Sequence, residues 1–210
     1  MFSWLKKVLS ERASSSPKST LQLRVETPIE RSLEIAHELA KPCVLLKREG
    51  DKLAAVWGGR GTVSGPEGYR HWLSVDCSFL PTGVGLKKGV ISIYSGGEDW
   101  DSGVVEYESN TTLSLNEGIP LYAHNALSMP PPDAHDDLDT DAYIRKWMDH
   151  CPVYIESATA VIGGWHFPWP DGDWEELCQK TLVLWTIEGS EPWIEVWKDG
   201  ETFRVCERGT

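Results

Sequence analysis

Apolar residues recur at helical spacing in two stretches of the chain, residues 28–41 and 139–150. Side chains three or four positions apart share one face of an α-helix, so each stretch can bury a face. The first stretch begins at Thr27-Pro28-Ile29-Glu30, a capping box with proline at the first helical position. The second pairs Tyr143 with Trp147, four positions later. The pattern predicts two amphipathic helices.

Shorter runs of β-branched and aromatic residues, many of alternating polarity, predict strands in both halves. The predicted strands cover residues 43–47, 53–57, 73–80, 90–94, 104–108, 111–115, 153–156, 158–162, 182–187, 193–197 and 202–206. Glu49-Gly50-Asp51 separates the first two strands and predicts a hairpin turn. Residues 116–137 lack this pattern and contain three consecutive prolines, so we expect loop there.

The two halves share an order of features. Each predicted helix is followed by an adjacent Cys/Pro pair and later by a strand that ends in Gly-Gly, at 55–59 and at 160–164. This order indicates an internal duplication. It predicts an α+β fold of two similar helix-plus-antiparallel-meander units, mostly antiparallel sheet, in which each helix covers one face of its sheet.

The same features divide the chain into four parts. Residues 1–20 form an N-terminal amphipathic segment and linker, and residues 21–115 form the first α+β unit. Residues 116–137 are a Pro/Asp-rich connector, and residues 138–210 form the second unit. The two units can pack as one compact domain.

The most distinctive stretch is residues 160–174, AVIGGWHFPWPDGDW. Gly163 and Gly164 permit a sharp change of direction, and Pro168 and Pro170 impose extended backbone on the residues before them. Asp173 has the sequence context of a helix N-cap. A stiff aromatic loop followed by a short helix, roughly residues 174–180, is therefore expected.

Two interpretations of this loop remain open. Its rings fold back over the core of a sheet, as large aromatic side chains usually do, or they face a ligand or partner, because rigid rings bind at low entropic cost. Carboxylates beside tryptophan, a pairing suited to sugar binding, occur here and near residue 100. The candidate binding residues are Trp165, His166, Phe167, Trp169, Asp171, Trp174, Asp99 and Trp100.

The charge is strongly negative, −12 over 210 residues. Residues 1–24 carry five basic side chains and one acidic one, so the rest of the chain is more acidic still. A negative surface repels the phosphate backbone, and this disfavours nucleic acid as a partner. It favours a basic protein, with the acidic segment 133–141 as one contact surface.

Five cysteines without a CxxC pair indicate reduced thiols in the cytoplasm. No apolar run is long enough to span a membrane. Residues 1–12 are amphipathic and basic on one flank, which leaves weak contact with a membrane surface open.

Catalytic signals are weak. The six histidines show no metal-binding spacing, there is no nucleophile elbow, and we expect neither a metal nor another cofactor. Gly58-Gly59-Arg60-Gly61-Thr62 could bind an anion through backbone N–H groups but lacks the P-loop pattern, which favours a plain tight turn.

These observations favour a non-catalytic binding protein that contacts another protein through the aromatic loop and the acidic surface. A toxin-neutralising immunity protein is one concrete form of such an acidic binder. The alternative is a metal- or carboxylate-dependent hydrolase with a site near His166, Asp171 and Asp173. A third option is a homodimer that buries the tryptophans in its contact.

Overall fold

The computed structural model describes residues 28–96, 103–150, 158–165, 180–187 and 193–208. Ten strands in these ranges join in one sheet, with the order β10-β9-β8-β7-β1-β6-β2-β3-β4-β5. The strands are β1 (Lys41–Lys47), β2 (Leu53–Trp57), β3 (Arg70–Asp76), β4 (Val90–Ser95), β5 (Val104–Glu108), β6 (Ile119–Ser128), β7 (Ala158–Gly163), β8 (Thr181–Thr186), β9 (Trp193–Asp199) and β10 (Thr202–Arg208).

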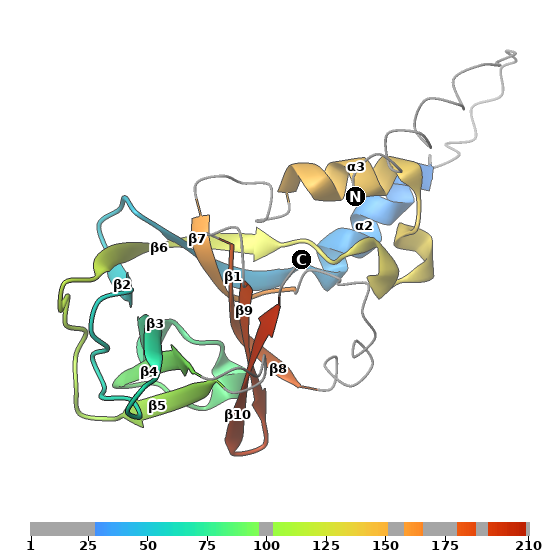
Figure 1. The fold of residues 1–210 in the computed structure, drawn as a ribbon. Helices are drawn as coiled ribbons and strands as arrows, with labels where there is room; N and C mark the ends of the chain where they lie inside the picture. Colours follow the sequence, from blue (N-terminus) through green and yellow to red (C-terminus); the bar gives the residue numbers. More distant parts are fainter. Residues whose placement is uncertain (1–27, 97–102, 151–157, 166–179, 188–192, 209–210) are drawn as a thin grey trace, which may run out of the picture.

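The sheet curls into a nearly closed barrel (Figure 1). Each pair of neighbouring strands is antiparallel. Among the described residues, an isolated antiparallel bridge joins Gly103, just before β5, to Val205 of β10 at the other end of the sheet. A side chain at Gly103 would collide with Val205, so the glycine permits this close approach. The main core includes Leu46, Leu73, Ile91 and other apolar side chains from both halves of the sheet.

The predicted α+β class with two helix-plus-meander units is therefore wrong: this is a mostly-β barrel with one ten-stranded sheet and, among the described residues, two α-helices. Antiparallel pairing was predicted correctly. The error lies at β1, which pairs with β6 on one side and β7 on the other. A strand buries both of its hydrogen-bonding edges most completely in the middle of a sheet, and β1 thereby joins the two halves.

The longest strand, β6, falls in the stretch expected to be loop, and that expectation was wrong for residues 119–128. Its sequence conceals it, because Pro120, His124 and Asn125 interrupt the apolar alternation and proline is rare in central strands. The prediction of a hairpin between β1 and β2 is also wrong, because it did not allow for β6. β6 lies between them, and its Tyr122 is opposite both Lys47 and Leu53.

The loop from β1 to β2 consequently passes over β6. His124 Nε2 lies 2.7 Å from the carbonyl oxygen of Glu49, at the tip of this loop. Gly50, with a φ of +151°, approaches Tyr122 so closely that a Cβ would lie 2.6 Å from the Cβ of that residue. Only glycine fits this crossing.

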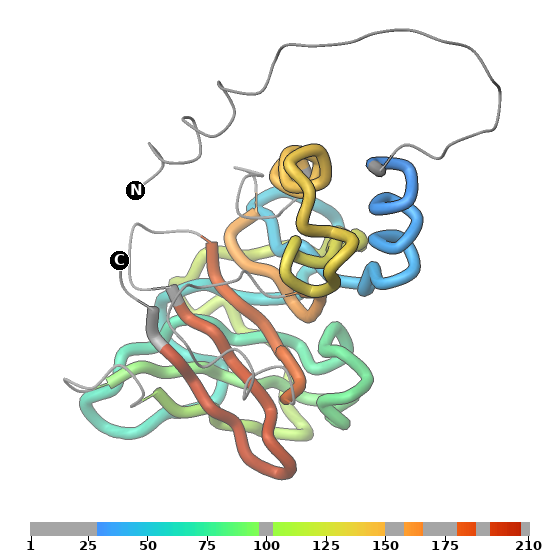
Figure 2. The backbone as a smooth tube through the Cα atoms, turned by 90° about the vertical axis from the view of Figure 1, so that its right-hand side faces the viewer, coloured from blue at the N-terminus to red at the C-terminus, as the bar shows by residue number. Residues whose placement is uncertain are grey.

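Both predicted helices are present, as α2 (Pro28–Leu39) and α3 (Asp141–His150). They lie together beside the barrel with two short 3₁₀ turns, η3 (Pro132–Ala134) and η4 (Asp136–Leu138) (Figures 1 and 2). Ala36, Leu138, Tyr143 and Trp147 form a separate small core between them. We call residues 28–40 and 129–149 the helical layer. Two further 3₁₀ turns, η1 (Cys77–Phe79) and η2 (Thr82–Val84), follow β3.

Other expectations concern single features. Cys43, Cys77 and Cys206 are buried and form no disulfide, which agrees with the expectation of mostly buried, reduced thiols. Residues 111–115 do not form the predicted strand, and β3 ends at Asp76 rather than at residue 80. Within the described ranges no helix is long and apolar enough to cross a membrane. Residues 1–20, Cys151, Cys178, the strand expected at 153–156 and residues 174–179 of the expected short helix lie outside the described residues.

Candidate functional site

The aromatic loop begins at Trp165, the one candidate binding residue that the structure describes. His166, Phe167, Trp169, Asp171, Trp174, Asp99 and Trp100 lie outside the described residues. The same holds for His166, Asp171 and Asp173 as the centre of the alternative hydrolase. Among the described residues no three His, Cys, Asp or Glu side chains are grouped to hold a metal ion.

The glycine pair before Trp165 turns the chain sharply, as its sequence predicted. Gly163 and Gly164 both have left-handed backbone, with φ of +67° and +82°. A Cβ at Gly164 would lie 2.8 Å from the Cβ of Ser128 and 3.0 Å from that of Cys43. The end of β7 is therefore pressed against the ends of β6 and β1, which fixes where the aromatic loop leaves the sheet.

Trp165 itself is half-buried and held from two sides. Its backbone N–H donates to Ser128 Oγ at 2.9 Å, and its indole N–H donates to the carbonyl oxygen of Leu39 at 2.8 Å. Leu39 is the last residue of α2, where helix carbonyls have no partner within the helix. The indole thus caps α2 and attaches the start of the aromatic loop to the helical layer.

Lys41 completes this attachment. Its ammonium lies 3.5 Å from the centroid of the Trp165 ring, the geometry of a cation–π contact. A positive charge just past the end of α2 is also favoured by the helix macrodipole. Of the two interpretations of the aromatic residues, the described contacts give Trp165 a packing role on one edge of its ring.

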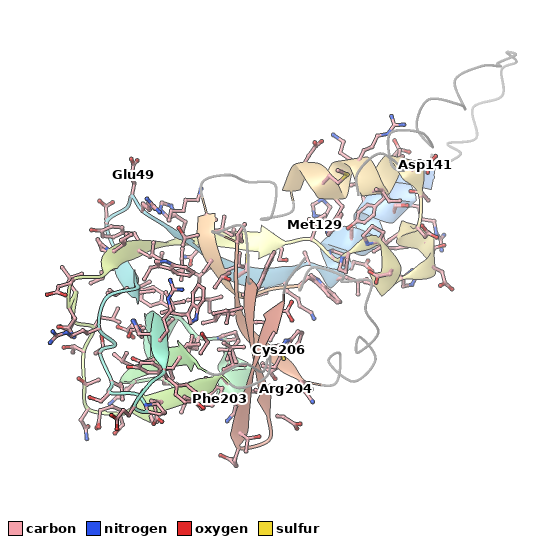
Figure 3. All side chains as sticks on the ribbon, viewed as in Figure 1. Glu49, Met129, Asp141, Phe203, Arg204 and Cys206 are labelled. Atoms are coloured by element: carbon pink, nitrogen blue, oxygen red, sulfur yellow. The ribbon has the colours of Figure 1, made fainter. Side chains whose placement is uncertain are left out.

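The helical layer is acidic over its exposed surface. Nine of its side chains are acidic and three are basic. The acidic residues are Glu30, Glu34, Glu38, Asp133, Asp136, Asp137, Asp139, Asp141 and Asp149; all are exposed except Asp137, which is partly buried. In Figure 3, Asp141 lies at the outer end of α3, and Met129 lies where β6 passes into the layer.

Local contacts hold the acidic segment 133–141 in place. Arg31 forms an ion pair with Asp137 at 3.3 Å, and Ser32 Oγ donates to the Asp137 carbonyl oxygen at 2.6 Å. Thr140 caps α3, because its Oγ1 accepts from the Tyr143 N–H at 3.1 Å. The acidic groups therefore project from an ordered backbone.

Several N–H groups of the glycine-rich segment after β2 already donate to groups within the protein. The N–H of Arg60 donates to Asn116 O, that of Thr62 to Ser74 Oγ, and that of Val63 to Ser92 Oγ. Sequence reasoning missed Ser74 and Ser92, which are buried together with His71. The available signal was a pair of serines inside otherwise apolar strands.

Comparison with known proteins gives no relative: no family matches this chain, and neither the curated proteins nor the solved structures contain a match.

Proposed function

We propose that this protein is a non-catalytic binding protein whose acidic helical layer docks a basic protein, with Trp165, the first residue of the aromatic loop, attached to that layer. The observation that carries the proposal is the 2.8 Å hydrogen bond from the Trp165 indole to Leu39 O. It attaches Trp165, the first residue of the aromatic loop, to the C-terminal end of α2, which belongs to the acidic helical layer.

The distribution of charge supports the same proposal. The excess of acidic side chains on the layer gives it a strong negative potential, which attracts a basic surface and accelerates encounter. The ordered backbone of segment 133–141 means that little conformational entropy is lost when a partner docks there.

The test is site-specific photocrosslinking in the cells that produce the protein. A photoreactive residue replaces Glu34, exposed on α2, or Glu117, exposed just before β6. Glu117 is the matched control because β6, ten residues long, separates it from the helical layer by about 30 Å. Position 34 should capture a protein of basic isoelectric point, and position 117 should not.

Charge variants sharpen the test. The triple variant E34Q/E38Q/D136N removes three negative charges from the layer, and E67Q/E108Q/E117Q removes three from exposed positions elsewhere. Because position 34 is changed in the first variant, the photoreactive residue is placed at position 145 on α3 for this comparison. Capture there should fall by about tenfold in the first variant, and also in 0.5 M salt. It should stay unchanged in the second variant. Equal effects of both variants would refute a docking layer, and capture of only a second copy would replace the basic partner by a homodimer.

A further inference from the structure

Residues 59–65, which we call the strap, lie across the face of β3 and β4 that points away from the main core. Gly61 and Gly65 lie against the Tyr94 ring, where a Cβ at either position would collide. The Tyr94 hydroxyl donates to the Val63 carbonyl oxygen. The N–H groups of Thr62 and Val63 point into the sheet, toward Ser74 and Ser92.

A buried chain of hydrogen bonds fastens the strap. Val63 N–H donates to Ser92 Oγ at 3.1 Å, the two serine oxygens lie 2.7 Å apart, and Ser74 Oγ lies 2.9 Å from His71 Nε2. Both serines are fully buried, and His71 is only 8% exposed. The distances in this chain are those of good hydrogen bonds.

The other ring nitrogen sets the direction of the chain. His71 Nδ1 lies 2.9 Å from the carbonyl oxygen of Gly58, which can only accept, so Nδ1 carries hydrogen. In the neutral ring Nε2 is then an acceptor, and Ser74 donates to it. Ser92 donates to Ser74 in turn and accepts from Val63. Ser74 also accepts from the Thr62 N–H at 3.0 Å, so its hydroxyl is fully used.

We propose that this chain is an acid-released clasp: protonation of His71 Nε2, which is buried beneath the strap, favours release of the strap. The imidazolium would donate where Ser74 now donates, so both serine hydroxyls must turn. It would also place a full charge among two hydroxyl groups and a carbonyl, which are neutral partners. An opened strap lets the charged ring reach water.

The groups around His71 come from β3, β4, β5 and the strap. β4 contributes Tyr94, whose ring centroid lies 5.3 Å from that of His71. β5 contributes Glu106, opposite Ser92, and the strap contributes the exposed Arg60. On β3 itself, Arg70 lies over Trp72 at 4.6 Å. Burial dominates and lowers the pKa of His71 despite its hydrogen bond to Gly58.

The clasp also controls a strained turn. Thr62 Oγ1 accepts from the Ser114 N–H at 3.1 Å, and Arg60 N–H donates to Asn116 O at 3.0 Å. Asn116 and Glu117 have φ of +35° and +66°, left-handed backbone that non-glycine residues adopt at a cost. Release of the strap therefore removes the contacts that hold residues 114–117, so both segments should loosen together.

Hydrogen exchange measures the release. His71 is protonated more readily when the strap is open, so the opening constant rises as pH falls below ~6.5, by about tenfold per unit, until the folded-state pKa is reached. The amides of Thr62 and Val63, corrected for intrinsic rates, should show this rise between pH 6.5 and 5.5. The Ala123 amide, bonded to Lys52 O in another loop, should not.

Variants and a titration decide the result. H71Q should abolish the rise, and H124Q, which alters a histidine bonded to Glu49 O, should retain it. If H71Q does not fold, an NMR titration of the wild-type His71 ring still decides: titration at or above ~6.5 overturns the clasp. A pH-independent opening constant in the wild type, or an unchanged rise in H71Q, overturns it as well.

Discussion

Replacing Trp165 with phenylalanine should separate the capping role of its indole from the bulk of its ring. The variant keeps an aromatic ring beneath Lys41 but deletes the N–H that donates to Leu39 O at 2.8 Å. The loss of one hydrogen bond costs about 1 kcal/mol. Because the Leu39 carbonyl at the helix end is then left without a protein donor, we expect a total cost of about 1–2 kcal/mol. For a chain of this size that corresponds to a fall in Tm of roughly 2–8 °C.

Two companion variants separate the contribution of the cation–π contact from that of the whole Trp165 side chain. Lys41→Met removes only the cation over the ring, and should cost about 0.5–1 kcal/mol because the contact is partly exposed. Trp165→Ala removes the ring, its contact with Lys41 and the cap together, and should cost about 2–3 kcal/mol, less than truncation of a fully buried tryptophan.

Urea denaturation followed by circular dichroism gives the free energy of unfolding for each variant, at unchanged slope if only the native state is affected. Hydrogen exchange in the last turn of α2 localises the loss. The reasoning is refuted if W165F unfolds within about 0.3 kcal/mol of the wild type, because the indole N–H would then contribute nothing to the helix end.

Three further outcomes follow from the geometry. Glu117→Gly should stabilise the fold by about 0.5 kcal/mol in urea denaturation, because glycine adopts the left-handed backbone without strain. Gly59→Ala should destabilise it by about 2–4 kcal/mol in the same assay, since a Cβ would lie 2.5 Å from Asn116 O. Burial raises the pKa of Cys43 and Cys77 to about 11, so at pH 8 both thiols should react with a disulfide reagent only after denaturation; reaction at the rate of a free thiol in the native state would contradict their burial.

The sequence was most informative where local patterns decide the structure. The capping box and periodicity of residues 28–39 predicted α2, and the spacing of Tyr143 and Trp147 predicted α3, because burial of one helix face is visible along the chain. Gly163-Gly164 likewise predicted a change of direction of the chain, and both residues have positive φ. These features depend on neighbours a few residues away.

The fold class could not be obtained in this way because it depends on which distant strands pair. The barrel is assembled around β1, whose partners β6 and β7 lie far from it in the chain. Local signals favoured a hairpin of β1 with β2. The sequence of β6 lacks the alternation of apolar and polar residues that would have identified it as a strand between them. Strand pairing over such separations is set by the edges left open elsewhere in the sheet.

The candidate site was predicted only in part for a similar reason. Composition identified Trp165 and the acidic segment 133–141, but the attachment of Trp165 to the helical layer depends on its hydrogen bond to Leu39 at the end of α2, which no local pattern shows. The buried chain of His71, Ser74 and Ser92 was missed, since a serine in a strand carries no mark of the partner it will find on the next strand.

The placement of the acidic groups on the helical layer is not explained by the stability of its helices. Glu30 lies in the first turn of α2, where the macrodipole favours a negative charge. Glu38 and Asp149, however, lie near the C-terminal ends of α2 and α3, where a negative charge is unfavourable by about 0.3–1 kcal/mol each. Mutual repulsion among nine acidic side chains adds to that cost. An opposite charge bound to this surface would offset that cost, and this supports the proposal that a basic partner docks on the helical layer.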